Sequence, residues 1–261
     1  MEAPRNREPI SWWSDHLQKD INLIVYGDSG YPIIAFQAQG SKCNNFEDFG
    51  MIDTLSDYLE EGIIQIFSVD NFDEDSWSAV GADPAWRAER QEAYFSFVTE
   101  ELVPFVHDYA NTDLRPLATG CSMGATHAAI AVLRRPDLFQ GCIALSGVYD
   151  AAYFFGDYMD GTLYENSPVT FMPNMPYDHP YIELYCQRQI VLCVGQGAWE
   201  DEGIRTERIL DEAFRKRGIS AWCDYWGFDV NHDWPWWKKQ IRYFLPIVLD
   251  DIKDMLVAGT Y

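Results

Sequence analysis

Short apolar runs alternate with helix-like segments along most of the chain, and this alternation constrains the fold most strongly. Runs typical of buried strands occupy residues 31–36, 62–69, 117–120, 141–146, 189–194 and 219–226. Segments with helical spacing of apolar residues occupy 49–61, 84–109, 125–133 and 203–216. This order predicts an α/β fold with a mostly parallel central sheet and helices on both of its faces.

The N-terminal part of the chain departs from the alternation. Residues 10–17 and 21–27 are both strand-like, and a polar turn at 18–20 separates them, so we expect an antiparallel hairpin there. Residues 84–109 read as one long helix, with a kink expected at Pro104. The sequence shows no linker or repeat, which predicts a single domain over residues 1–261. Residues 148–188 keep no clean period and are expected to form a cap-like insertion over the carboxyl ends of the strands.

Charge and composition exclude several classes of partner. The formal net charge of −22 opposes binding to nucleic acid or to an anionic membrane by simple repulsion. The longest apolar runs fall far short of the roughly 20 residues that span a bilayer. The charged N-terminus resembles no secretory signal, so we expect a cytoplasmic location. The six cysteines form no C-x-x-C pair, and we expect buried, reduced thiols rather than disulfides or a zinc site.

A possible nucleophile lies between a strand and a helix. Gly120-Cys-Ser-Met-Gly124 fits the G-x-S-x-G elbow, in which small residues let the chain turn sharply and expose the serine. An ordinary glycine-serine turn would give the same string. The short apolar strand before it and the small-residue helix after it favour the elbow, with Ser122 as the nucleophile.

A serine hydroxyl needs a base, and an elbow of this kind is followed along the chain by an acid and then by a histidine. Of the five histidines, only His232 follows the last predicted strand. The loop after residue 194 offers Glu200 and Asp201 as the acid, and the sequence leaves both open. Either carboxylate could instead stabilise the N-terminus of the following helix.

Backbone N–H groups commonly stabilise the oxyanion that forms in acyl transfer. The N–H of Met123, directly after the nucleophile, is the first expected donor. The second is expected from the loop at residues 37–41, and we nominate the N–H of Gln39, with Ala38 as its neighbour.

Three segments together resemble the putative esterase family of the α/β-hydrolases. They are the elbow, the Gln-Gly-Ala-Trp-Glu-Asp string at 196–201 and the His-Asp-Trp-Pro-Trp-Trp string at 232–237. The resemblance extends from Tyr26 to Pro246 and includes esterase D, feruloyl and acetyl xylan esterases and bacterial mycolyltransferases. It implies the α/β-hydrolase fold, a serine–acid–histidine triad and acyl-ester chemistry. The sequence departs from the family at Gln37–Gly40, where relatives often carry a glycine-rich or proline-containing turn.

These observations favour a serine esterase that forms an acyl-enzyme on a small or carbohydrate-linked ester, with no metal and no organic cofactor. Thioesterase, peptidase and acyltransferase activities with the same triad stay open, as does a non-catalytic binding protein. A thiol enzyme that uses Cys121 is a further alternative. The expected partner is a small-molecule ester, and a homo-oligomer is possible. The sequence predicts neither the natural substrate nor the acyl-chain length.

Overall fold

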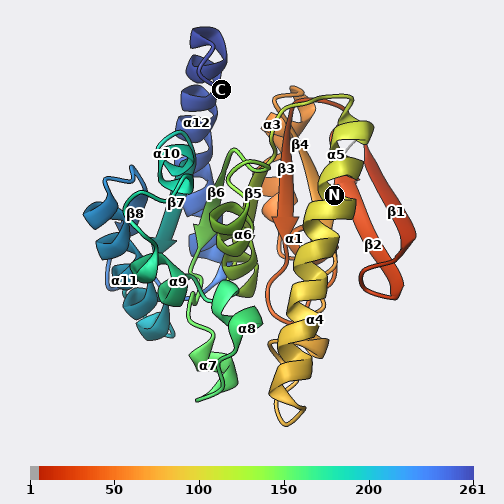
Figure 1. The fold of residues 1–261 in the computed structure, drawn as a ribbon. Coiled ribbons are helices and arrows are strands. Elements are labelled where there is room, and N and C mark those ends of the chain that lie inside the picture. Colours follow the sequence, from red (N-terminus) through yellow and green to blue (C-terminus); the bar gives the residue numbers. More distant parts are fainter. Residues whose placement is uncertain (1–5) are drawn as a thin grey trace.

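The computed structural model describes residues 6–261, through which one eight-stranded sheet runs (Figure 1). Its strands are β1 (Arg7–Ser14), β2 (Lys19–Tyr26), β3 (Tyr31–Phe36), β4 (Ile64–Val69), β5 (Leu117–Cys121), β6 (Gly141–Leu145), β7 (Gln189–Val194) and β8 (Trp222–Tyr225). They lie in the order β1-β2-β4-β3-β5-β6-β7-β8. β2 pairs antiparallel with β1 and with β4, and all pairs from β4 to β8 are parallel. The predicted α/β-hydrolase arrangement with an N-terminal hairpin is confirmed.

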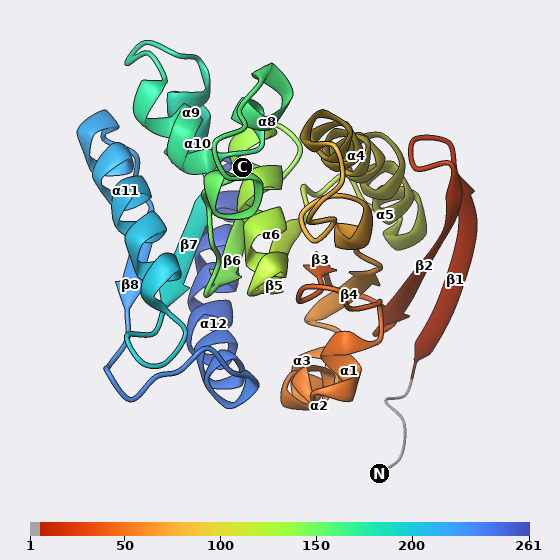
Figure 2. The ribbon, with the colours of Figure 1, turned by 90° about the horizontal axis from the view of Figure 1, so that it is seen from below.

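Helices cover both faces of this sheet (Figure 2). One face carries α4 (Pro84–Phe97), α5 (Val103–Ala110), α6 (Met123–Arg134) and α11 (Asp201–Arg217). The other carries α1 (Asn45–Asp48), α2 (Met51–Thr54), α3 (Ser56–Glu60) and α12 (Trp234–Ala258). The short helices α7 (Ala152–Phe155), α8 (Gly161–Glu165), α9 (Pro168–Asn174) and α10 (Tyr181–Tyr185) lie between β6 and β7 in the chain. Of these, α7 and α8 lie beyond the lower edge of the sheet in Figure 1.

The central strands are buried on both sides, and their side chains alternate between the two layers. In β6, Cys142 and Ala144 pack with the α6 layer, whereas Ile143 and Leu145 pack with the α12 layer. Successive side chains of a strand point to opposite faces, so one short apolar strand contributes to two cores.

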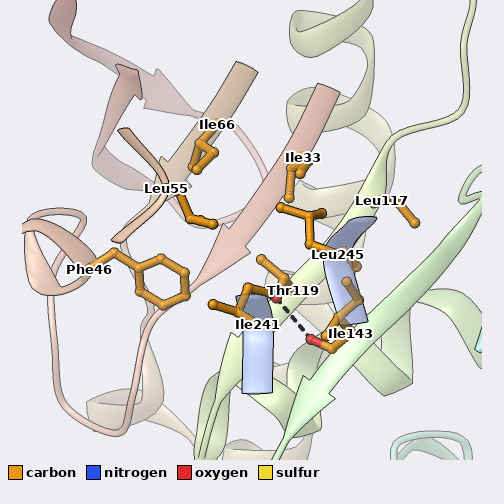
Figure 3. Close-up of a pocket in the computed structure, with 10 residues that line it drawn as sticks. Ile33, Phe46, Leu55, Ile66, Leu117, Thr119, Ile143, Ile241 and Leu245 are labelled. Atoms are coloured by element: carbon orange, nitrogen blue, oxygen red, sulfur yellow. Dashed lines mark hydrogen bonds between the residues drawn. The ribbon is translucent and has the colours of Figure 1, made fainter. Parts of the chain in front are cut away.

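A small void remains on the α12 side of the sheet (Figure 3). It measures about 10 Å³, close to the smallest space that holds one water, and aliphatic side chains such as Ile33 and Leu245 line it. The hydroxyl of Thr119, also in the lining, donates to the carbonyl of Ile143 at 2.8 Å. No lining polar group is left to bind a ligand, so this space is a packing gap.

The turn of the N-terminal hairpin lies at residues 15–18, so it begins three residues and ends two residues before the predicted turn at 18–20. The carboxylate of Glu101 accepts hydrogen bonds from the Ser14 hydroxyl, at 2.8 Å, and from the His16 N–H, at 3.0 Å. A distant acidic side chain therefore fixes the turn, which the local strand pattern could not show.

The long helix predicted for 84–109 is interrupted by a wider π-helical turn over Val98–Leu102, which separates α4 from α5. Pro104 follows this turn. Proline lacks the N–H that would bond to the carbonyl of Glu100, and its ring would collide with that carbonyl in a regular helix. The wider turn accommodates the ring, and α5 follows α4 in roughly the same direction in Figure 1.

All six cysteines are free, as expected, but they are not all buried. Cys186 is exposed and Cys223 is half-buried, which corrects the prediction that the thiols are buried. Within residues 6–261, none of the helices has the length and apolar character needed to cross a bilayer.

Candidate active site

Ser122 occupies a sharp turn between β5 and α6. Its backbone is in a rare conformation, with φ 56° and ψ −121°, as a nucleophile elbow requires. Close packing requires glycine at both flanking positions, 120 and 124. A Cβ on Gly120 would lie 2.3 Å from the backbone carbon of Gly124, and a Cβ on Gly124 would lie 2.2 Å from the carbonyl oxygen of Phe36. The predicted strand, turn and helix are therefore present, and only glycine fits on either side.

Three of the predicted side chains meet at this turn. The Oγ atom of Ser122 lies 2.9 Å from Nε2 of His232, and Nδ1 of His232 lies 3.0 Å from Oε2 of Glu200. Glu200 is buried, whereas the side chain of His232 is 22% exposed. Such an arrangement can supply a serine hydroxyl with a base and that base with an acidic partner.

Asp201, the other acidic candidate, makes no hydrogen bond to His232. It is the first residue of α11, where its carboxylate interacts favourably with the helix dipole. It also lines the pocket in front of Ser122. The structure thus brings Glu200, and not Asp201, to the histidine.

The loops that carry Glu200 and His232 are bound to each other through the backbone. The N–H of His232 donates to the carbonyl of Ala198 at 3.0 Å, and the N–H of Gly197 donates to the carbonyl of Val230 at 2.8 Å. A Cβ on Gly195 would lie 2.1 Å from the same Val230 oxygen. Glycine thereby allows the loop after β7 to approach the loop after β8 closely enough to fix the acid relative to the histidine.

Ser146 and Trp237 extend the network. Neither was predicted as a site residue, although Trp237 ends the string at 232–237 that carries the family resemblance. The Ser146 hydroxyl donates to Oε1 of Glu200 at 2.7 Å, and Nε1 of Trp237 donates to the Ser146 hydroxyl at 2.9 Å. The Trp237 ring also meets the His232 ring edge-on, with centroids 5.0 Å apart. Ser146 follows β6 at the carboxyl edge of the sheet, and that position was the one signal available in the sequence.

Two backbone N–H groups near Ser122 have no acceptor among the described residues. Met123 is the first residue of α6, and its N–H is one of the free donors of the helix N-terminus. The N–H of Gln39 is likewise unpaired, whereas the N–H of Ala38 donates to Oδ1 of Asn45 at 3.2 Å. Of the two loop donors considered, Gln39 is therefore the one available to a ligand.

An open pocket of about 410 Å³ contains these groups. Its lining comes from five separate segments: Gln39, Ser122, Met123, Thr126, Val148, Tyr153, Phe154, Trp199, Asp201, Glu202 and His232. Glu202 pairs with Arg205 at 2.9 Å, and Arg205 also reaches Asp150 at 2.7 Å. The lining itself contains aromatic rings and carboxylates but no lysine or arginine, so it is better suited to an uncharged ligand than to an anion.

Two other reactive side chains near the elbow have structural roles. Burial raises the pKa of the Cys121 thiol well above its ordinary value, which keeps this cysteine protonated and unreactive. His127, on α6, bonds through Nε2 to Oδ1 of the buried Asp73 at 2.8 Å, away from the pocket lining. Among residues 6–261, no group of three or more histidine, cysteine or acidic side chains is arranged to hold a metal ion.

Comparison with known proteins gives a family and a fold. The family model described as putative esterase matches residues 14–246. A ferulic acid esterase superposes with a TM-score of 0.72 at 16% identity, covering 94% of this chain and 98% of its own. An S-formylglutathione hydrolase from Agrobacterium tumefaciens gives 0.69 at 15% identity, with 94% and 95% covered. MPT51 (FbpC1) of Mycobacterium tuberculosis gives 0.70 at 16% identity, with 96% and 100% covered. A search of curated protein sequences gives no significant match.

Proposed function

The chain belongs to the putative esterase family, and from this premise we propose that it is a serine esterase that hydrolyses small or carbohydrate-linked carboxylic esters through an acyl-enzyme on Ser122. The observation that carries the proposal is the continuous hydrogen-bonded series from Ser122 through His232 to the buried Glu200. Such a series converts a weakly nucleophilic hydroxyl into an attacking group.

In the first step, Oγ of Ser122 attacks the ester carbonyl carbon while Nε2 of His232 takes the hydroxyl proton. Glu200 holds the imidazole by its other nitrogen and stabilises the positive charge that develops there. The carbonyl oxygen becomes an oxyanion, and we assign its binding to the N–H groups of Met123 and Gln39, which have no acceptor among the described residues. The tetrahedral intermediate collapses when His232 gives its proton to the leaving alcohol.

Water completes the reaction. It loses a proton to His232, attacks the acyl-enzyme carbonyl and releases the carboxylic acid, and the proton returns to Ser122. The open pocket and the partial exposure of His232 give water access to the acyl group, which supports hydrolysis over an acyl transfer that must exclude water. We further propose that residues 148–188 act as a cap over this pocket, to which they contribute Val148, Tyr153 and Phe154.

The test is hydrolysis of p-nitrophenyl acetate and p-nitrophenyl butyrate by the wild type, Ser122→Ala and His232→Ala. His127→Ala is the matched histidine control, because His127 lies outside the pocket lining. We expect activity in the wild type, its loss in the first two variants and its retention in any folded His127→Ala protein. A wild type that is inert towards both esters would instead support a non-catalytic binding protein.

A further inference from the structure

Trp199 combines two unfavourable features at the mouth of the pocket. The residue is 89% exposed, and its backbone has φ 68°, a left-handed conformation that favours glycine. The large indole of Trp199 thus contributes almost nothing to the core, and the backbone that carries it is strained. Strain of this kind is concentrated at ligand-binding and catalytic sites, which makes Trp199 a candidate for ligand contact.

The position of Trp199 relative to the reacting groups is well defined. It lines the same pocket as Ser122 and His232, and it directly precedes Glu200 in the chain. Its neighbour Ala198 accepts the hydrogen bond from the His232 N–H, which fixes this loop beside the histidine. Tyr153 and Phe154, the other aromatic side chains of the lining, come from α7 instead.

The direction of proton transfer shows which part of an ester meets this loop. His232 must deliver a proton to the leaving oxygen, so the alcohol lies on the histidine side of Ser122. The carbonyl oxygen points to the opposite donors, Met123 and Gln39. Trp199 lines the pocket next to Ala198, whose carbonyl accepts the His232 N–H, and from this neighbourhood we infer that its indole meets the alcohol half of the ester.

We propose that Trp199 determines specificity for the alcohol half of the substrate by stacking on the face of an uncharged ring. This inference rests on the proposed esterase function and names the class of leaving group. Exposed indole faces bind flat apolar surfaces, which both a phenyl ring and the C–H face of a sugar present. The carboxylate of Asp201, also in the pocket lining and without a cationic partner among the described residues, disfavours an anionic alcohol.

The experiment compares butyrate esters that differ in the alcohol alone: ethyl butyrate, benzyl butyrate and 6-O-butyrylglucose. The variants are Trp199→Gly, Trp199→Phe and, as a control, Phe228→Ala. Phe228 is an exposed aromatic residue, at 82%, on the neighbouring loop outside the pocket lining. All three esters form the same butyryl-enzyme, so its deacylation is the same for each. Differences in kcat/KM between the esters therefore report how the alcohol half is recognised.

We expect Trp199→Gly to lower kcat/KM for benzyl butyrate, for 6-O-butyrylglucose or for both. That loss should exceed the loss for ethyl butyrate by about three- to tenfold, which corresponds to the free energy of one aromatic contact. The ester with the larger loss identifies the ring as aromatic or sugar. Trp199→Phe should restore most of the preference, and Phe228→Ala should leave it unchanged. The Tm of Trp199→Gly should equal or exceed that of the wild type, since glycine relieves the strained φ.

A purely structural role for Trp199 would produce a lower Tm and an equal loss of kcat/KM on all three esters. The inference is overturned if kcat/KM does not fall, or if it falls equally on all three. A different result, a wild type that hydrolyses none of the butyrates, would count against the esterase function itself. The two failures are therefore distinguishable.

Discussion

The hydroxyl of Ser146 donates a 2.7 Å hydrogen bond to Oε1 of Glu200, so that only Oε2 is left to meet His232. The Ser146 hydroxyl in turn accepts from the indole N–H of Trp237, which is buried in α12. The acidic group of the site is thereby anchored to the core on the far side of the sheet from α6. We interpret Ser146 as a positioning residue that fixes the orientation of the carboxylate without contact with the substrate.

Replacing Ser146 by alanine should therefore lower kcat while KM changes little. The substitution leaves a buried carboxylate oxygen and an indole N–H without partners, which costs about 1–3 kcal/mol and corresponds to a loss of about 5- to 150-fold in kcat if the carboxylate reorients. Steady-state kinetics on p-nitrophenyl butyrate would measure this. Ser220→Ala, at an exposed serine, is the control. A raised KM with unchanged kcat would contradict a positioning role.

The choice between the two acidic candidates can be tested with isosteric amides. Glu200→Gln keeps the shape of the side chain but removes the charge that stabilises the imidazolium, and we expect kcat to fall by about three to four orders of magnitude. Asp201→Asn should change kcat less than tenfold, because this carboxylate does not contact His232. Equal losses in the two variants would show that Glu200 is not the sole acid of the triad.

The elbow makes a prediction about stability. Gly124→Ala should destabilise the protein by about 1–3 kcal/mol or more, because the added Cβ would enter the backbone of Phe36. Gly161→Ala, where a Cβ meets nothing within 4 Å, should be tolerated. Thermal unfolding, monitored by circular dichroism, gives the Tm of both variants and of the wild type. Similar Tm values for Gly124→Ala and the wild type would mean that the strand and helix pack less closely than described.

Glu207 should make stability depend on pH. It is fully buried on α11, neither carboxyl oxygen has a hydrogen-bond partner among the described residues, and burial raises its pKa well above the ordinary value. Above the ordinary carboxyl pKa, the unfolded chain has lost this proton while the folded protein retains it. The free energy of unfolding therefore falls as the pH rises towards the folded pKa, by up to about 1.4 kcal/mol per pH unit.

Glu207→Gln should remove that slope, which urea unfolding between pH 5 and pH 8 would measure. The variant should gain stability relative to the wild type at the higher pH. Glu183→Gln, at an exposed glutamate, should keep the wild-type slope. If Glu207→Gln retained the slope, the carboxyl would be ionised in the folded protein.

Much of the fold follows from local patterns in the sequence. The predicted strands at 31–36 and 189–194 coincide with β3 and β7, because a short apolar run between turns has few other conformations available in a large protein. Two features were not predicted. The hairpin turn is held by Glu101, which is distant in the sequence, and the π turn before Pro104 is one of several ways in which a helix accommodates a proline.

In the candidate site, too, some residues could be predicted from the sequence and others could not. Ser122 and His232 could be nominated because the glycine spacing and the chain order restrict them. Nothing in the sequence separated Glu200 from Asp201, since neighbouring residues at a helix start differ only in the direction of their side chains. Ser146 was missed because its role depends on the alignment of β6 with β7, which places it opposite the acidic loop.

Labelling with a fluorophosphonate probe, followed by peptide mass spectrometry, tests the central claim most directly. A serine that is activated by His232 and Glu200 should form a covalent phosphonyl adduct on Ser122. The adduct should be absent from Ser122→Ala and should form far more slowly in His232→Ala. A folded wild type that forms no adduct, or one that carries it on a residue other than Ser122, would contradict the account.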